Sequence, residues 1–341
     1  DHKQAACDKV MPPCNRIARP GLIAGSEFRR ARSRLKEGIH VTDAGGLIGS
    51  EAWSELLRRG FGSSRLDFNT VGMGASTTWT TFSRLGIKAA YAGFPVGFDE
   101  AAPDTLRNIS PMLAALRGAG VDIARFSLPG AVEVPGVDAG GVTDLTETSI
   151  ESLEIWSEGS LSASVRRKIG KSRRMGAMIR PAEPNDGSLL HGMYAEMIGR
   201  HRGRLRYTES YFDALCALAA SDARLSIGVV VDGEASPCGF IAAAHARTVS
   251  HYLHGGFASR CASLRPGYLA MAWAIERSRD YGSERFNMLT SPKGQPALVA
   301  YKESFGGKSY VRRHYDVPLS PVGRFCSWGL GLVNGWRRAD R

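Results

Sequence analysis

Near the end of the chain, an aromatic residue and a lysine stand side by side just before two glycines, in the run YKESFGG at positions 301–307. Residues 295–304 are predicted to form a helix, which would fix the direction of both side chains. An ammonium group held at such a place can stabilise the oxyanion that forms when an amine attacks a thioester or an ester. Lys302 and Tyr301 are therefore the first catalytic candidates. The alternative is a surface lysine whose stem lies along apolar surface.

The attacking amine would arrive protonated, so the reaction also needs a general base. The candidates are residues that carry a carboxylate or an imidazole in the second half of the chain: Glu196, His201, Glu209, His251 and His254. His201 is kept as the catalytic candidate beside Lys302 and Tyr301. His251 and His254 flank Tyr252 in a predicted strand, and strict alternation would turn them to opposite faces. At most one of the two is expected to face a shared cleft.

An anion site is predicted where the run RPGY at positions 265–268 joins a strand to a helix. Proline in the first helical position and glycine next to it leave backbone N–H groups open at the helix N-terminus, where the dipole favours a phosphate. Arginines beside such a turn can add bidentate contacts. A pyrophosphate-bearing donor is expected to meet Arg260, Arg265, Gly267 and Tyr268. The alternative is an ordinary proline-capped helix.

Basic residues gather in two segments that contain no acid. Seven stand between Ser160 and Arg180, and four more lie between Arg200 and Tyr207. The chain has 44 Lys and Arg against 33 Asp and Glu, a net charge of +11, which favours a phosphate-bearing, tRNA or acidic lipid partner. These segments are interpreted as walls of an anionic cleft, and a solvated basic face is the alternative. The predicted substrate-binding residues are Arg166, Lys171, Arg204, Arg206, Tyr207 and Tyr252.

Other chemistries find little support in the sequence. Its six cysteines are far apart, with no C-x-x-C pair and no Cys/His spacing typical of zinc, so no metal is expected. The run GKS at positions 170–172 ends like a phosphate loop, but Val165 replaces the upstream glycine. G-x-S-x-G, H-E-x-x-H and G-x-G-x-x-G are missing as well. A run of about 20 apolar residues, as a membrane span requires, is also missing.

Alternating secondary structure must position these residues. The first half is predicted to contain helices at 50–61 and 103–116 and strands at 64–71, 77–82, 87–94 and 121–128. The second half is predicted to contain helices at 161–175, 187–200, 209–220, 266–280 and 295–304, and strands at 177–179, 224–231, 239–246, 251–257, 285–289 and 309–317.

The two halves share an order of features that indicates a duplication. Each has a strand with an aromatic and a glycine at its exit, a helix that begins at proline, a glycine stop and a further strand. Tyr91 to Gly120 spans 29 positions, and Tyr252 to Gly282 spans 30. Any two strand-helix-strand units share part of this order, which is the alternative. With a Pro- and Gly-rich stretch at 129–141 as the boundary, we predict a poorly ordered basic leader at 1–40, halves at 41–150 and 151–318, and a tail at 319–341.

A strand meander that runs into such a turn and helix resembles the acyl-CoA-binding element of GNAT acetyltransferases. Leu269 occupies the second glycine position of the usual Q/R-x-x-G-x-G/A pattern. More widely, residues 156–315 resemble the Fem-like branch of that superfamily, which contains peptidoglycan aminoacyltransferases and related envelope acyltransferases. The matching segments are the basic helix 161–176, the helix 194–204, residues 265–282 and the run YKESFGG. The run YAGFPVG at 91–97 resembles the first of the two halves in that branch.

This resemblance implies an α/β (α+β) fold with two GNAT-like domains, each a mixed, largely antiparallel sheet flanked by helices. It implies direct transfer of an acyl group from acyl-CoA or a similar activated donor to an amine of a cell-envelope sugar or peptide precursor. Acyl-CoA would be a co-substrate, and no cofactor would be tightly bound. Tyr301 and Lys302 match the aromatic-lysine pair that meets the donor in aminoacyl-transferring relatives.

Two other functions stay open from the sequence. One is tRNA-dependent aminoacyl transfer to peptidoglycan precursors, which the basic segments would suit. The other is a non-catalytic nucleic-acid-binding protein, which the lack of aromatic and basic interleaving on a recognisable module disfavours. The expected location is cytoplasmic or peripheral at the inner face of the membrane. The tail RFCSWGLGLVNGWRR at 324–338 could contact that membrane, or it could pack on its own domain.

Overall fold

The computed structural model describes residues 46–69, 76–98, 103–137, 139–200 and 203–326. All of these fall within one compact unit, residues 44–341. His201, the whole basic leader and residues 327–341 of the tail lie outside the described residues, so the predictions made for them stay predictions.

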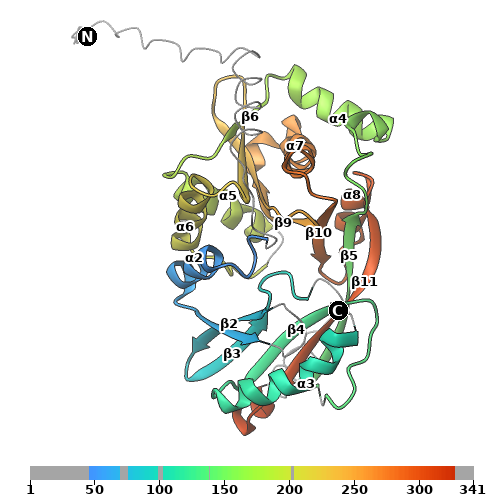
Figure 1. The fold of residues 1–341 in the computed structure, drawn as a ribbon. Helices are drawn as coiled ribbons and strands as arrows, with labels where there is room; N and C mark the ends of the chain where they lie inside the picture. The colour runs from blue at the N-terminus through green and yellow to red at the C-terminus, as the bar shows by residue number, and fades with distance from the viewer. Residues whose placement is uncertain (1–45, 70–75, 99–102, 138, 201–202, 327–341) are drawn as a thin grey trace, which may run out of the picture. The chain divides into compact units, whose positions relative to one another are not determined.

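The strands of the described residues form one mixed sheet of eleven strands, in the order β1-β2-β3-β4-β11-β5-β10-β9-β8-β7-β6 (Figure 1). The pairs β3/β4 and β9/β10 are parallel, and the other neighbours are antiparallel. In chain order the strands are β1 (Ser64–Asn69), β2 (Ser76–Arg84), β3 (Ile87–Ala92), β4 (Ile123–Pro129), β5 (Gly141–Ile150), β6 (Met178–Pro181), β7 (Leu225–Val231), β8 (Pro237–Ala244), β9 (Val249–Phe257), β10 (Arg285–Ser291) and β11 (Lys308–Pro318).

The α-helices of the described part match the segments predicted as helices. They are α2 (Glu51–Phe61), α3 (Pro103–Gly118), α4 (Ala163–Arg174), α5 (Gly187–Arg200), α6 (Glu209–Ala219), α7 (Pro266–Tyr281) and α8 (Pro296–Glu303). Two short 3-10 helices, η1 (Glu158–Ser160) and η2 (Ser259–Leu264), precede α4 and α7. Local signals explain several ends: the Ser50 hydroxyl accepts from the Trp53 N–H at the start of α2, and Gly282 ends α7 with φ 95°.

One continuous sheet replaces the two separate sheets that were expected, because β11 lies between β4 and β5 (Figure 1). Its register with β4 runs from Arg312 opposite Pro129 to Pro318 opposite Ile123. On its other side, β11 pairs with β5 from Lys308 to Asp316. The last strand of the predicted second half thereby satisfies backbone groups that would otherwise form a sheet edge in the first half.

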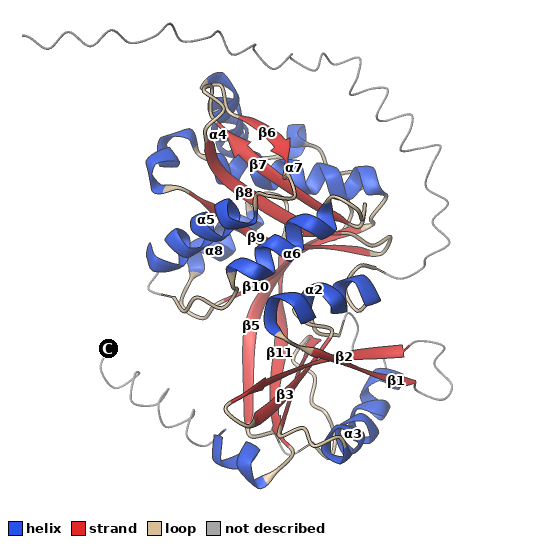
Figure 2. Cartoon of the chain, turned by 90° about the vertical axis from the view of Figure 1, so that its left-hand side faces the viewer, coloured by secondary structure: helices blue, strands red, loops and turns tan. Residues whose placement is uncertain are grey.

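Three apolar cores cover the sheet. One lies between α3 and strands β3, β4 and β11, and a second lies under α4 and α7. The third lies on the opposite face from α7 and joins α2 to α5 and α6, which stand together in Figure 2. There Trp53 of α2 is buried and donates from Nε1 to the Phe94 carbonyl at 2.8 Å. The first described helix, α2, therefore packs against helices of the predicted second half.

Candidate functional site

The parallel strands β9 and β10 separate soon after they meet. They pair only from Arg285 opposite Val249 to Asn287 opposite His251, although β9 continues to Phe257 and β10 to Ser291. An irregularity in β10 between Asn287 and Thr290 accompanies the separation, and Leu289 there has φ 57°. Such a conformation is strained for a leucine, and strain of this kind concentrates at functional sites.

Lys302 of α8 holds this strained turn from one side. Its side chain is only 3% exposed, and Nζ donates to the carbonyl oxygens of Leu289 at 2.8 Å and Thr290 at 3.3 Å. Burial lowers the pKa of Lys302 to about 8, and the nearby Glu147 carboxylate opposes that shift. Lys302 is thus a buried cation and not a surface lysine. These two carbonyl oxygens engage two of its three N–H groups.

Tyr301 and the start of α7 meet beside Lys302. The Tyr301 hydroxyl donates to the Gly267 carbonyl at 2.8 Å, and the Tyr268 ring lies 5.3 Å from the Tyr301 ring. Lys168 of α4 donates to the Tyr268 hydroxyl at 2.9 Å. The structure therefore brings together three residues that the sequence predicts to meet the donor, Tyr301, Gly267 and Tyr268.

The two arginines predicted to flank this helix start differ in their surroundings. Arg265 is exposed and directly precedes Pro266, with φ 55°. Arg260 donates to the Pro237 carbonyl at 2.7 Å and to the Cys261 thiol at 3.1 Å, so its guanidinium is held at the start of β8. Arg265 is the one better placed to meet a ligand phosphate.

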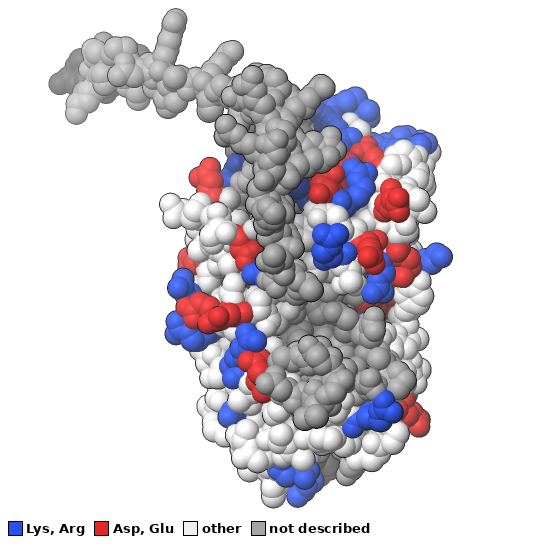
Figure 3. Space-filling model, in the orientation of Figure 1, with Lys and Arg blue, Asp and Glu red and all other residues white. Residues whose placement is uncertain are grey.

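The basic helix α4 packs beside α7 and presents charge outward. Val165, Ile169 and Ser172 are buried, and the Ser172 hydroxyl contacts the Leu264 and Arg265 carbonyls. The exposed basic side chains of this helix are Arg166, Arg167, Lys171, Arg173 and Arg174. Figure 3 shows Lys and Arg gathered at the upper end of the molecule, where α4 lies in Figure 1. Partners from other segments neutralise part of this charge: Glu158 pairs with Arg173 at 2.7 Å and Asp186 pairs with Arg180 at 2.6 Å.

The other predicted substrate-binding residues lie elsewhere. Arg204 and Arg206 are exposed, and Tyr207 packs among aromatic rings that include His254, where burial raises the Tyr207 pKa. Tyr252 packs against the core under α4 and α7, and burial raises its pKa to about 12. The residues predicted to bind substrate therefore divide between the two faces of the sheet.

A bulge in β9 overturns the expectation that His251 and His254 face opposite sides. Ala244 pairs with His251 and Ala242 pairs with His254, and both alanines belong to the core under α2, α5 and α6. The register shift adds one residue to β9 and so changes the alternation. Both histidines are buried at 6% exposure on this one face, and burial lowers the pKa of His254 to about 3.

The remaining base candidates are engaged or remote from Lys302. His254 Nε2 lies 2.8 Å from the Tyr211 hydroxyl, and Glu196 accepts from the Ser259 N–H at 2.7 Å. Glu209 is exposed at the start of α6, 4.0 Å from His191. None of the three is shown in contact with the Lys302 group.

Three buried polar residues on β5, β10 and β11 were missed by the sequence reasoning. Glu147, Asn287 and Arg312 are each less than 10% exposed, and the Glu147 carboxylate accepts from Arg312 Nε and Asn287 Nδ2. Asn287 Oδ1 accepts from the Leu289 N–H at 2.7 Å, so this cluster contacts the same strained turn as Lys302. Glu147, Asn287 and Arg312 also line a cavity of about 300 Å³. The alternating Arg312, His314 and Asp316 in a predicted strand were the signal that could have identified this face.

Metal-binding clusters and membrane-spanning helices are both absent from the described residues. No group of three or more His, Cys, Asp and Glu side chains there is arranged to hold a metal ion. None of the described helices is both long enough and apolar enough to cross a membrane.

The region around Lys302 and α7 matches a known protein family. The family described as "Acetyltransferase (GNAT) domain" matches residues 159–303, which run from η1 to the end of α8. A search of curated proteins found no similar sequence. Similar solved structures include FemX, with TM-score 0.62 and 11% identity over 83% of this chain and 95% of that one.

Two other solved structures share the fold at similarly low identity. L-PGS from Bacillus licheniformis has TM-score 0.51 and 13% identity over 82% of this chain and 96% of that one. A tandem GNAT protein from the clavulanic acid biosynthesis pathway has TM-score 0.50 and 9% identity over 81% and 98%. These likenesses concern the fold, whereas the family match concerns the domain that contains Lys302. The family match thus identifies residues 159–303 as a GNAT acyltransferase domain.

Proposed function

We propose that the chain is an N-acyltransferase that moves an acyl group from acyl-CoA to an amine of a cell-envelope sugar or peptide precursor. The observation that carries the proposal is the start of α7, which lies beyond the separated ends of β9 and β10 inside the GNAT-matching region. We also take residues 41–150 and 151–318 as two GNAT-like halves that share one sheet. The similarity to a tandem GNAT protein supports this division.

The start of α7 has the chemistry to hold a pyrophosphate. Its first turn combines the helix dipole, Pro266 in the first position and the exposed Arg265. Exposed Arg166 and Lys171 on the neighbouring α4 add positive charge. Leu269, which replaces the second glycine of the usual pattern, is buried in the core, so the phosphate contacts would fall on Gly267 and Arg265.

The reaction would proceed by direct attack. The amine nitrogen attacks the thioester carbonyl, the carbon–sulfur bond breaks, and the thiol leaves with a proton taken from the amine. The Lys302 ammonium would stabilise the oxyanion. Tyr301 would act as a positioning residue, because its hydroxyl ties α8 to the Gly267 carbonyl.

Replacing Gly267 by aspartate tests the donor site. A Cβ atom at Gly267 would meet only the Tyr301 hydroxyl, at an ordinary 3.5 Å, so the fold should tolerate the change. A carboxylate at the helix start suits the helix but repels a phosphate, so the Kd for CoA is expected to rise at least about tenfold in calorimetry. Gly192→Asp is the matched control, because Gly192 is exposed in α5 with no atom within 4 Å of the added Cβ. Wild-type affinity of Gly267→Asp for CoA would remove this donor site.

An aminoacyl-tRNA donor is the second candidate, and the outward basic face of α4 favours it. Arg167→Glu combined with Lys171→Glu should weaken RNA binding and reduce its dependence on salt if tRNA is the donor. Activity that survives ribonuclease and needs only purified acyl-CoA would exclude it.

The GNAT domain makes a non-catalytic nucleic-acid-binding role the weakest of the three candidate functions. The acyltransferase proposal includes contact of the tail with the inner face of the membrane. Residues 327–341 of that tail lie outside the described part.

A further inference from the structure

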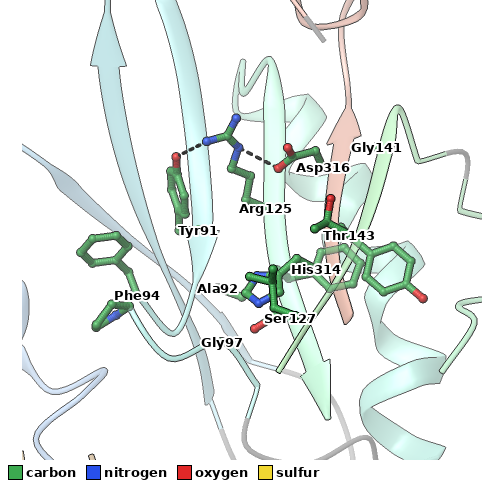
Figure 4. Close-up of a pocket in the computed structure, with 14 residues that line it drawn as sticks. Tyr91, Ala92, Phe94, Gly97, Arg125, Ser127, Gly141, Thr143, His314 and Asp316 are labelled. Carbon is green, nitrogen blue, oxygen red and sulfur yellow. Dashed lines mark hydrogen bonds and ion pairs between the residues drawn. The ribbon is translucent and has the colours of Figure 1, made fainter. Parts of the chain in front are cut away.

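A second cavity, of about 290 Å³, opens on the part of the sheet built by β3, β4, β5 and β11 (Figure 4). We call it the Arg125 pocket. Its floor consists of side chains that lie side by side in the strand register: Tyr91, Arg125, Ser127, Thr143, His314 and Asp316. The intervening residues Phe126 and Tyr315 pack into the core under α3. The pocket therefore lies on the face that α3 leaves uncovered.

An arginine in a fixed orientation dominates the pocket. Arg125 Nε lies 2.8 Å from the Asp316 carboxylate, and Arg125 Nη1 donates to the Tyr91 hydroxyl at 2.6 Å (Figure 4). The side chains of Arg125 and Asp316 remain 32% and 46% exposed, so both still have polar atoms that a ligand can reach. The guanidinium offers donors and the carboxylate offers acceptors, side by side.

One wall of the pocket is rigid. Phe94, Pro95 and Gly97 belong to the turn after β3, and Trp53 donates to the Phe94 carbonyl. Gly97 has φ 94°, and a Cβ atom there would collide with the Ser127 hydroxyl, so the turn packs closely against β4. Arg312 Nη1 also donates to the Phe98 carbonyl, directly after this turn, at 3.0 Å. A preformed wall reduces the entropy cost of binding a ligand.

The charges of the lining identify the class of ligand. Arg125 and Asp316 are the charged residues of the lining and cancel each other, while burial and the neighbouring Arg312 lower the pKa of His314 and keep it neutral. A phosphate would meet the Asp316 carboxylate, and a free ammonium would meet Arg125. An uncharged ring with several hydroxyl groups would use the donors and acceptors together, and the Phe94 ring offers it an apolar wall. The volume lies at the lower end of ordinary ligand sites, about 300–1,000 Å³, and suits one ring.

We propose that the Arg125 pocket binds one uncharged sugar ring of the acceptor, at a distance from the amine that is acylated. This rests on the proposed function. Thr143 and Glu147 are four residues apart on β5, about 13 Å at the rise of a strand. Glu147 stands opposite Thr290, whose carbonyl accepts from Lys302. An acceptor that occupies both places must therefore be longer than a single amino sugar, with the sugar ring and the reacting amine on separate groups.

The test is binding of uncharged methyl glycosides, measured by saturation-transfer NMR on the complete protein without any acyl donor. The panel contains the methyl glycosides of glucose, galactose, rhamnose and N-acetylglucosamine. Wild type is expected to show transfer to at least one of them, whereas Thr143→Trp, which fills the pocket from its floor, should show none. Val142→Trp is the matched control, because Val142 is 50% exposed on the opposite face of the same strand and should keep the wild-type signal.

Two outcomes would overturn the proposal: no transfer from wild type to any glycoside of the panel, or an unchanged signal in Thr143→Trp. Arg125→Met gives a second variant in case the tryptophan does not fold, and it is expected to lose the signal as well. Inorganic pyrophosphate should fail to displace the glycoside. The measurement needs no acyl transfer, so its result is independent of CoA binding to Gly267→Asp. A failed donor site and a failed sugar pocket are thus distinguishable.

Discussion

Replacing Lys302 by methionine is expected to lower kcat by about 100- to 1,000-fold, the usual effect of losing one donor to an oxyanion. Methionine has a similar length, so it fills the space under the Leu289 turn without a large cavity. The protein should stay folded, because the change also removes a buried charge. Steady-state kinetics with acyl-CoA, together with circular dichroism, provide the measurement. Lys308→Met, an exposed position on β11, is the control, and full activity of Lys302→Met would remove Lys302 from the mechanism.

Titration of Lys302 should change kcat and the free energy of unfolding in opposite directions as pH rises. If the ammonium form is active, kcat should fall as pH rises through the Lys302 pKa of about 8. The unfolded chain keeps its lysine protons up to about pH 10.4, so between these values the unfolded state binds more protons and stability rises with pH. The gain of wild type relative to Lys302→Met should reach roughly 3 kcal/mol across this range. Urea unfolding at both ends of the range checks the sign, and a stability difference that ignores pH would contradict the buried-cation interpretation.

Removing the charge of Glu147 should cause the largest loss of stability. Glu147→Gln leaves the Arg312 guanidinium, 4% exposed, without its carboxylate, which is expected to cost about 3–5 kcal/mol in the free energy of unfolding. Glutamine keeps only one acceptor oxygen for the two donors Arg312 Nε and Asn287 Nδ2, so one of them loses its partner. Urea unfolding at pH 7 measures the difference.

A neighbouring ion pair is the matched control for this experiment. Asp144→Asn breaks the pair with Arg313 on the same two strands, where the Asp144 side chain is 43% exposed, and should cost less than about 1 kcal/mol. The double variant Glu147→Gln/Arg312→Met should recover part of the loss, because the unpaired charge is gone. Equal losses in Glu147→Gln and Asp144→Asn would show that the Glu147–Arg312 pair has no special role.

The helices were predictable because their signals are local. Each described α-helix coincides with a predicted segment to within a few residues, and caps such as Ser50 and Gly282 act within one turn of their helix. The helix start at Pro266 was identified in the same way. The resemblance to GNAT acetyltransferases also came from contiguous runs of sequence, and the family match over residues 159–303 confirmed it.

The central strand β5 was missed, because its sequence is polar and follows a Pro- and Gly-rich stretch. Residues 141–150 include Asp144 and Glu147, which suggest a loop when considered alone. Their partners come from far along the chain: Glu147 bonds to Asn287 and Arg312, at separations of 140 and 165 residues. A buried acid is compatible with a strand only when such partners are present.

The sequence by itself determined the helices, including the proline at the start of α7, and the GNAT resemblance, since each depends on residues close together in the chain. Only the tertiary structure decided how the halves join. In the pairing of β11 with β4, Arg312 lies opposite Pro129, 183 residues earlier in the chain, and no local pattern encodes that register. It also decided which face His251 and His254 share, since one extra residue in β9 changes the alternation. The environment of Lys302 was settled in the same way, by strand irregularities and buried partners that appear only when distant segments pack together.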